Sequence, residues 1–181
     1  MKYKVYLAGP DVFKPNAKEH GKALVNLLDH WNMEGLYPLD NEIDTVAIER
    51  EPLGGFGPNI VANKVDIGKA IALANMEMIQ RCDAVLANLE PFRGPSADVG
   101  TVWECAYAKG LGKIVCGYNA VNLDYKFKVL GKVPHDGMLV EDFGVWDNIM
   151  LVHGIDILEQ SIQDALTKIK SKLDLREKQN G

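Results

Sequence analysis

The sequence predicts an α/β domain whose mainly parallel sheet is covered by helices on both faces. Short apolar runs typical of buried strands alternate with longer segments in which apolar residues recur at helical spacing. Glycine and proline separate these segments. The chain has 181 residues, of which 47% are hydrophobic and 25% charged. That size and balance are typical of one domain with one core, so we expect residues 1–181 to form a single domain.

The first half of the chain is predicted to contain two strands and two helices. A strand is expected over residues 2–8, where large apolar side chains follow one another. Asn16 is the expected cap of a helix that continues to about residue 32, because the apolar residues there share one face. A short second strand is predicted over 36–39. Residues 50–58, rich in glycine and proline, are expected to form a surface loop, followed by a helix over 59–81.

The middle of the chain continues the alternation. The sequence predicts a third strand over residues 83–89, a helix over 97–109 and a fourth strand over 113–118. Two glycines at 110 and 112 provide the signal that ends the helix. Residues 119–134 are polar and aromatic and show no clear period.

The C-terminal part is predicted to be mainly helical. Residues 140–144 are expected to be extended or to form a turn, and residues 146–151 to begin a short helix. The last helix is predicted over about 155–175, because its apolar residues lie on one face. Residues 176–181 are polar and are expected to fray.

Composition excludes several classes of function. The net charge is -5 and no basic stripe occurs, which argues against a nucleic-acid polymer as partner. No apolar run is long enough to span a membrane, and we expect no membrane partner. The N-terminus leads directly into a strand without a signal-peptide pattern, so a cytoplasmic location is expected.

Metal and nucleotide motifs are also missing from the sequence. The three cysteines, Cys82, Cys105 and Cys116, have no paired spacing and lie among apolar residues, so we interpret them as core thiols. The four histidines are scattered, and we expect no metal. Neither G-x-G-x-x-G nor G-x-x-x-x-G-K-[ST] occurs, which argues against a dinucleotide fold and against hydrolysis of nucleoside triphosphates.

Residues 91–104 (PFRGPSADVGTVWE) are the segment that points most clearly to chemistry. They form a glycine-punctuated loop that leads from a predicted strand into a helix and presents Ser96, Asp98 and Glu104. α/β proteins place their chemistry at the carboxyl ends of parallel strands. The helix N-terminus is expected to favour the ionised form of Glu104, which could then act as a nucleophile or stabilise a cation. Two carboxylates at one pocket suit cleavage of a glycosidic bond. The alternative is that Glu104 is a solvated helix residue.

Aromatic residues near the same strand ends are further candidates. Tyr6 lies near the carboxyl end of the first strand and could hydrogen-bond a carboxylate in the crevice, or could simply be buried in the sheet. Phe13 and Phe92 lie on loops and could stack on a planar base or pack against the protein.

Charged residues on the loops have two interpretations as well. Asp40 and Glu42 follow the second predicted strand and could contact polar edges of a ligand, or could form a charged turn. Arg93 could bind an anion or could hold its loop in place.

Four segments together resemble the nucleoside 2-deoxyribosyltransferases. They occur in the order expected for that family, at residues 6–10 (YLAGP), 38–41 (PLDN), 82–88 (CDAVLAN) and 91–104. The last two together are the most specific, with the glutamate four residues after Gly100. Residues 140–151 also resemble a late segment of the family, so that the resemblance extends over about residues 3–153.

The resemblance implies a flavodoxin-like three-layer fold with a mainly parallel, roughly five-stranded sheet. It implies transfer of the 2-deoxyribosyl group from one purine or pyrimidine base to another, with retention, in nucleotide salvage. The partners would be 2'-deoxynucleosides and free nucleobases, and no cofactor is implied. Glu104 matches the nucleophile that holds a covalent intermediate, and Tyr6 matches the tyrosine that orients it. Asp98 matches a carboxylate near the sugar 3'-hydroxyl and the base.

The same resemblance implies further substrate contacts. Glu42 falls where some members place a glutamine that contacts the base. Asp147 and Asn148 resemble residues that reach into a neighbouring subunit and bind the sugar 5'-hydroxyl, which implies a homo-oligomer with sites completed by a neighbour. Within the matched motifs and the loops beside them, we also expect contacts from Gly9, Asp11, Phe13, Asp40, Asn88, Arg93 and Ser96.

One position departs from the family pattern. Several relatives carry an aspartate eight residues before the position of Asp83, as the candidate proton donor to the leaving base, and this chain has Asn75 there. An amide can hydrogen-bond the sugar or base, but it is no general acid. Asp98 or Asp11 would then supply the proton, or solvent would.

Two other functions are compatible with the same motifs. One is an N-glycoside hydrolase acting on deoxynucleosides or on deoxynucleoside 5'-monophosphates. Relatives that accept monophosphates have a serine- and arginine-rich loop after the first strand, whereas Asp11 stands in that loop here and would repel a phosphate. The other is a non-catalytic nucleoside-binding module.

Overall fold

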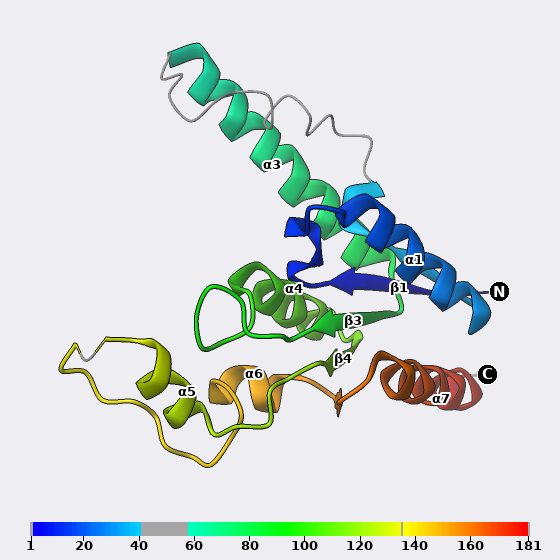
Figure 1. The fold of residues 1–181 in the computed structure, drawn as a ribbon. Coiled ribbons are helices and arrows are strands. Elements are labelled where there is room, and N and C mark those ends of the chain that lie inside the picture. The colour runs from blue at the N-terminus through cyan, green and yellow to red at the C-terminus, as the bar shows by residue number, and fades with distance from the viewer. Residues whose placement is uncertain (1, 41–57, 135, 181) are drawn as a thin grey trace.

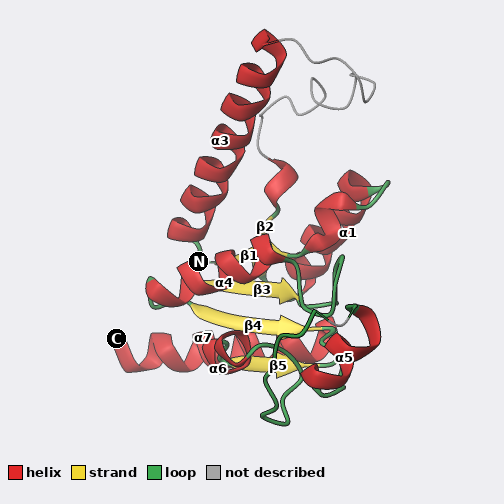
Figure 2. Ribbon diagram, turned by 90° about the vertical axis from the view of Figure 1, so that its left-hand side faces the viewer, coloured by secondary structure: helices red, strands yellow, loops and turns green. Residues whose placement is uncertain are grey.

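A parallel sheet of five strands forms the centre of the structure, a computed structural model that describes residues 2–40, 58–134 and 136–180 (Figure 1). The strands lie in the order β2-β1-β3-β4-β5, and every neighbouring pair is parallel (Figure 2). This is the flavodoxin-like order, so the predicted fold class is confirmed. The strand bounds are β1 Tyr3–Ala8, β2 Met33–Leu36, β3 Ala84–Asn88, β4 Ile114–Tyr118 and β5 Ile157–Glu159.

Helices cover both faces of this sheet, and the side chains of β1 alternate between them. Val5 and Leu7 pack in a core with α1 and α7, whereas Tyr6 and Ala8 pack in a second core with α3, α4 and α6. Each side of the sheet therefore has its own apolar core, as parallel sheets require. The helix bounds are α1 Ala17–His30, α3 Pro58–Arg81, α4 Val99–Gly110, α5 Tyr125–Lys132, α6 Ile149–Gly154 and α7 Ile162–Asn180.

The second strand lies earlier in the chain than predicted. β2 ends at Leu36, and the residues predicted as strand instead continue into a short 3-10 helix, η2, at Pro38–Asp40. The backbone N–H of Asp40 donates to the carbonyl of Tyr37 at 3.0 Å. Proline has no N–H to give to a strand and its fixed φ suits the first position of a helix, so Pro38 begins the turn.

The C-terminal region also differs from the prediction. The edge strand β5 lies inside the segment predicted as the last helix, and α7 begins only after Ser161. Ser161 Oγ accepts a hydrogen bond from the backbone N–H of Asp164 at 3.1 Å, which caps the helix. In the segment that was expected to fray, α7 continues to Asn180, and Arg176 donates to the carbonyl of Gly112 at 3.0 Å.

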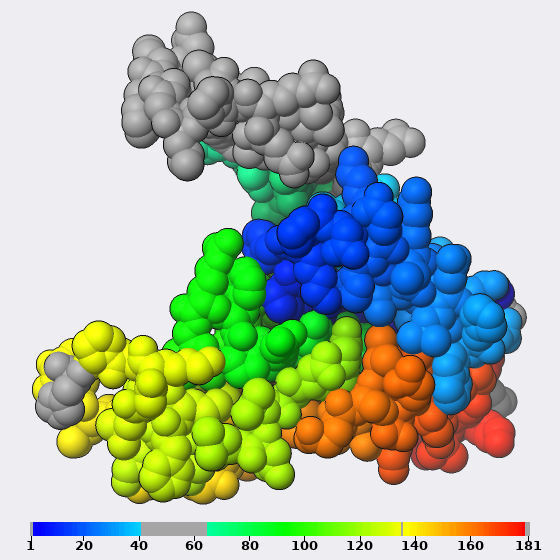
Figure 3. Space-filling view, in the orientation of Figure 1, coloured from blue at the N-terminus to red at the C-terminus, as the bar shows by residue number. Residues whose placement is uncertain are grey.

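Two other segments extend from the layered body. The predicted helix over 59–81 is present as α3, and its N-terminal part projects away from the sheet (Figures 1 and 2). The segment around α5, which showed no helical period, projects beside the body in the space-filling view (Figure 3). The predicted loop over 50–58 lies outside the described residues except for Pro58, where α3 begins. Within the described ranges, none of the helices has both the length and the apolar character that crossing a bilayer demands.

We expect Gly21 to be essential for the packing of α1. A Cβ built at Gly21 would lie 2.2 Å from the ring of the buried Tyr37, which immediately precedes η2. Gly21→Ala should therefore destabilise the fold by roughly 1–3 kcal/mol, because the core cannot accept the added volume.

Gly68→Ala in α3 is the matched control, since its added Cβ meets nothing within 4 Å. It should stabilise the protein by up to about 1 kcal/mol through helix propensity. Urea unfolding of both variants measures this, and equal effects would contradict the packing argument.

Candidate active site

A cavity of about 330 Å³ opens at the carboxyl ends of β1 and β3. These strands are neighbours in the sheet but lie on opposite sides of the point where strand order reverses, which is where open α/β sheets bind ligands. The wall of the cavity combines apolar side chains with a few convergent polar groups, as is usual for small-molecule sites. The lining residues are Gly9, Val12, Phe13, Pro38, Leu39, Ile71, Asn75, Asp98, Gly100, Thr101 and Glu104.

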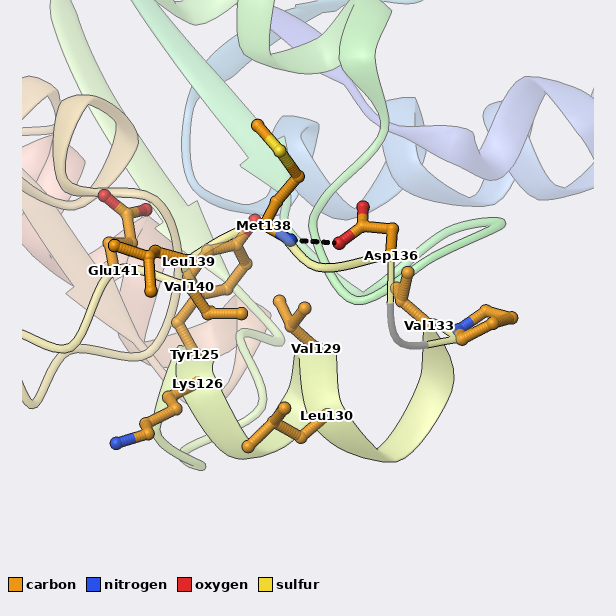
Figure 4. Close-up of a pocket in the computed structure, with 11 residues that line it drawn as sticks. Tyr125, Lys126, Val129, Leu130, Val133, Asp136, Met138, Leu139, Val140 and Glu141 are labelled. Atoms are coloured by element: carbon orange, nitrogen blue, oxygen red, sulfur yellow. Dashed lines mark hydrogen bonds between the residues drawn. The ribbon is translucent and has the colours of Figure 1, made fainter.

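A larger cavity of about 610 Å³ lies between α5 and residues 133–134 and 136–141 (Figure 4). Aliphatic side chains supply most of its lining. Of its charged side chains, Lys126 pairs with Asp142 at 2.5 Å, Glu141 accepts from Asn148 at 2.8 Å, and Asp136 accepts from the backbone N–H of Met138 at 2.9 Å. This groove therefore lacks the convergent acid and base groups of the smaller cavity.

Side chains from two elements, β1 and α3, converge on the carboxylate of Glu104, which lies on α4. Tyr6 on β1 is fully buried, and its hydroxyl donates to Glu104 Oε1 at 2.6 Å. Asn75 on α3 places its amide nitrogen 3.5 Å from the same oxygen, a longer contact. Burial and the charge of Glu104 raise the pKa of Tyr6 far above its usual value, so Tyr6 remains a donor. Among the described residues, both hydrogen bonds to this carboxylate use Oε1, and Glu104 lines the cavity.

Burial dominates the electrostatics of Glu104. It raises the pKa of the carboxyl group to about 7, with a further increase from the charge of Asp98 and opposing hydrogen bonds from Tyr6 and Asn75. The expectation that the helix N-terminus would favour the ionised form is thus wrong. Glu104 lies five residues after Val99, where α4 begins. The helix dipole acts mainly within the first turn, so desolvation is the larger effect.

Asp98 is the N-cap of α4. Its Oδ2 accepts from the backbone N–H of Thr101 at 2.9 Å and from the Thr101 hydroxyl at 3.1 Å. α4 therefore begins after Asp98 and not at residue 97 as predicted. Asp98 and Glu104 line the same cavity, which is the shared pocket expected from their spacing. Thr101 was not among the predicted residues, although its position three residues after a capping aspartate is a recognisable signal.

Asp11 and Asn88 lie behind the cavity wall and do not line it. Asn88 is buried and its amide donates to Asp11 Oδ2 at 3.0 Å, while Asp11 Oδ1 pairs with Lys14 at 2.5 Å and His20 at 3.1 Å. Because its charge is balanced by Lys14, the argument that Asp11 repels a phosphate finds no support. Gly9 allows this close approach, since a Cβ there would lie 2.8 Å from the Cβ of Asn88.

An aromatic stack forms one edge of the cavity. The rings of Phe13 and Phe92 lie 5.2 Å apart with an interplanar angle of 10°, and Phe13 lines the cavity. The guanidinium of Arg93 lies over both rings at 5.1 and 4.7 Å. Of the two interpretations of Arg93, this contact favours the one in which it holds the loop.

Several predicted residues lie outside the cavity. Asp40 is exposed beside the lining residue Leu39, and Glu42 lies outside the described residues. Ser96 lines a different cavity of about 440 Å³ between α4 and α6. Asp147 lines that same cavity but is 1% exposed, and both of its carboxylate oxygens accept hydrogen bonds from its own chain. Asn148 is exposed at the N-terminus of α6.

Side chains that could bind a metal ion are dispersed in the described parts of the chain. In the parts of the chain that the structure describes, no group of three or more His, Cys, Asp or Glu side chains could hold a metal ion. The three cysteines are free and buried, as predicted. Burial raises the pKa of Cys82 to about 11, so its thiol stays protonated.

Comparisons with known proteins identify the family and agree with the fold. A family model described as nucleoside 2-deoxyribosyltransferase matches residues 5–150. A solved 2-desoxiribosyltransferase from Leishmania mexicana is 29% identical, with a TM-score of 0.67 over 93% of this chain and 97% of that chain.

More distant similarities concern the fold or part of the chain. A 2-deoxyribosyltransferase from Bacillus psychrosaccharolyticus, at 17% identity, has the same fold with a TM-score of 0.54 over 89% of this chain and 88% of its own. An uncharacterized protein of Schizosaccharomyces pombe is 31% identical over 126 residues. That match includes 69% of this chain but 54% of the yeast protein, so the chain spans about half the length of this relative.

Glu104 should lower the stability of the protein as pH rises. Its pKa is raised in the folded state from 4.5 to about 7, so the folded protein binds more protons than the unfolded chain between these values. Stability is therefore lost as pH increases through this window. Glu104→Gln should be more stable than the parent by roughly 1–3 kcal/mol at pH 8 and of similar stability near pH 4.5.

Urea unfolding across this pH range measures the difference. Glu90→Gln is the control, because Glu90 is exposed. A Glu104→Gln advantage that does not depend on pH would contradict burial as its cause.

Proposed function

Because the chain belongs to the nucleoside 2-deoxyribosyltransferase family, we propose that it moves the 2-deoxyribosyl group of a 2'-deoxynucleoside from one purine or pyrimidine base to another. Membership of this family and the similarity to the Leishmania mexicana structure support a deoxyribosyltransferase or a related N-glycosidase. The observation that carries the finer proposal is the carboxylate of Glu104, which lines the cavity and is held through one oxygen by Tyr6.

The proposed reaction has two displacements at C1' of the sugar. Oε2 of Glu104 attacks C1' while the N-glycosidic bond breaks, and its electron pair leaves with the base, which takes up a proton. A ring nitrogen of the second base then attacks C1', the bond to Glu104 breaks, and the incoming base loses its proton. Two inversions give net retention. Tyr6, which donates to Oε1 at 2.6 Å, would keep Oε2 directed at the sugar throughout.

The source of the proton for the leaving base follows from the cavity lining. Asn75 cannot serve, because an amide is no general acid. Asp11 is engaged behind the wall by Lys14 and Asn88. Among the described residues, Asp98 is the cavity-lining carboxylate that remains besides Glu104. We assign to Asp98 a contact with the sugar hydroxyl and the transfer of a proton between the base and solvent.

Substrate binding would use the apolar walls and the aromatic stack. Phe13 presents a ring at the cavity edge on which a planar base can stack. The exposed Asn148 is the member of the 147–148 pair that could contact the 5'-hydroxyl of a nucleoside bound in a neighbouring chain. The proposal therefore includes a homo-oligomer with sites completed by a neighbour.

Removing the nucleophile should abolish base exchange. With deoxyinosine as donor and adenine as acceptor, we expect Glu104→Ala to lower the rate of deoxyadenosine formation by roughly 10³-fold or more. Chromatography of the four compounds measures it, with Glu90→Gln as control because Glu90 is exposed. Exchange by Glu104→Ala at near the parent rate would refute the assignment.

Omitting the acceptor distinguishes the transferase from its alternatives. A transferase requires adenine for sustained release of hypoxanthine, whereas a hydrolase releases it equally well without adenine. A binding module would saturate with nucleoside and release no base.

Tyr6→Phe should move the pH dependence of the reaction. The hydrogen bond from Tyr6 lowers the pKa of Glu104, so its loss raises that pKa and reduces the ionised fraction near neutral pH. A hydrogen bond to a charged group contributes about 1.5–3 kcal/mol, so the acid limb of kcat/KM should move up by about one to two pH units. The rate should fall more at pH 6 than at pH 9. An unchanged acid limb would show that Glu104 is not the group that titrates.

A further inference from the structure

Asp147 is a buried carboxylate that holds the backbone of the loop leading into the active site. Its Oδ2 accepts from the backbone N–H of Ala97 at 3.3 Å, and its Oδ1 accepts from the N–H of Asn148 at 2.8 Å. Ala97 immediately precedes Asp98, the N-cap of α4 and a lining residue of the cavity. The hydrogen bond between Ala97 and Asp147 joins residues that are 50 positions apart in the chain.

The loop that Asp147 holds is also closed by contacts within itself. Residues 91–97, here called the 91–97 loop, close on themselves through a bridge between Pro91 and Ala97 and a hydrogen bond from the N–H of Phe92 to the carbonyl of Ser96 at 3.0 Å. The internal contacts give the loop its shape, and Asp147 ties that shape to α6. Without Asp147, the end of the loop that leads into α4 would lose this external anchor.

Lys128 neutralises the charge of Asp147. Its ammonium lies 3.3 Å from Asp147 Oδ2, and both residues are at most 4% exposed. The rings of Tyr125 and Trp146 lie 5.8 and 6.0 Å from the ammonium and add cation–π contacts. Lys128 comes from α5, which lies beyond the carboxyl ends of the strands (Figure 1). A buried carboxylate without such a cation would strongly destabilise the fold.

We propose that Asp147 is a positioning residue for the active site, acting through Ala97 to set the placement of Asp98 and of the first turn of α4. This inference rests on the proposed function of Glu104 and Asp98. Lys128 has the separate role of making the buried charge of Asp147 tolerable. The sugar-binding role that the family resemblance implies for Asp147 is replaced by one inside its own chain.

Two variants separate the positioning role of Asp147 from its effect on stability. One variant should be the less stable of the two, and the other should be the less active. Lys128→Met keeps Asp147 and its hydrogen bond to Ala97, but leaves a buried carboxylate unpaired. Lys128→Met/Asp147→Leu removes both charges and also the acceptor for Ala97. Replacing a buried ion pair by apolar residues is often tolerated, whereas removing one partner is not. The single variant should therefore melt at a lower temperature than the double variant.

Activity per folded molecule should follow the reverse order. Base exchange by Lys128→Met should stay within about threefold of the parent, whereas the double variant should lose roughly tenfold to hundredfold in kcat/KM, because small misplacements of catalytic groups are costly. Amide hydrogen exchange of residues 91–101 should accelerate in the double variant alone. If Lys128→Met does not fold, the kcat/KM and the hydrogen exchange of the double variant are compared with those of the parent, and this comparison tests the positioning role.

The outcomes of the experiment are distinguishable from failure of the proposed function. If the parent exchanges bases and the double variant does so within about twofold of it, the positioning role is wrong, since even modest displacement should cost more. If the parent has no base exchange, the proposed function fails, and hydrogen exchange at 91–101 still reports whether Asp147 holds the loop. Unchanged hydrogen exchange in the double variant would overturn the inference by itself.

Discussion

The hydrogen bond from Tyr6 to Glu104 is the interaction on which the candidate active site depends. It joins a fully buried residue of the central sheet to a carboxylate that burial would otherwise make still harder to ionise. Among the described residues Glu104 has no salt-bridge partner, so a neutral phenol and an amide are its support. A carboxylate held in this way is poised near neutral pH at the expense of stability, and a site needed for structure alone would not be expected to keep it.

Three buried or half-buried acids near the strand ends differ in whether a lysine neutralises them. Asp11 pairs with Lys14 and anchors the loop after β1, and Asp147 pairs with Lys128 and anchors the loop before α4. Glu104 differs from these two acids because, among the described residues, it has neutral donors and no lysine partner. The two lysine-paired acids hold loops that lead to the cavity, while Glu104 itself lines the cavity.

The prediction from sequence was most accurate where local pattern and burial agree. The central strands β3 and β4 are short apolar runs buried along their whole length, and the motif that leads into α4 is specific. The short edge strand β5 could not be distinguished from the apolar face of the helix that follows it, since three residues do not establish a period. α5 was not predicted because the sequence around it shows no clear period, and its Lys128 is buried beside Asp147 only in the fold.

The sequence alone determined the fold class, the family resemblance and the two carboxylates of the cavity, because these depend on local residue patterns and on motifs in a set order. Tertiary structure decided the protonation of Glu104 and the separate positions of Asp11 and Asp147. These properties depend on burial and on partners far along the chain: Tyr6 and Glu104 are 98 residues apart, and Asp11 and Asn88 are 77 apart. A charge in a sequence has no defined pKa until the fold sets its solvent and its neighbours.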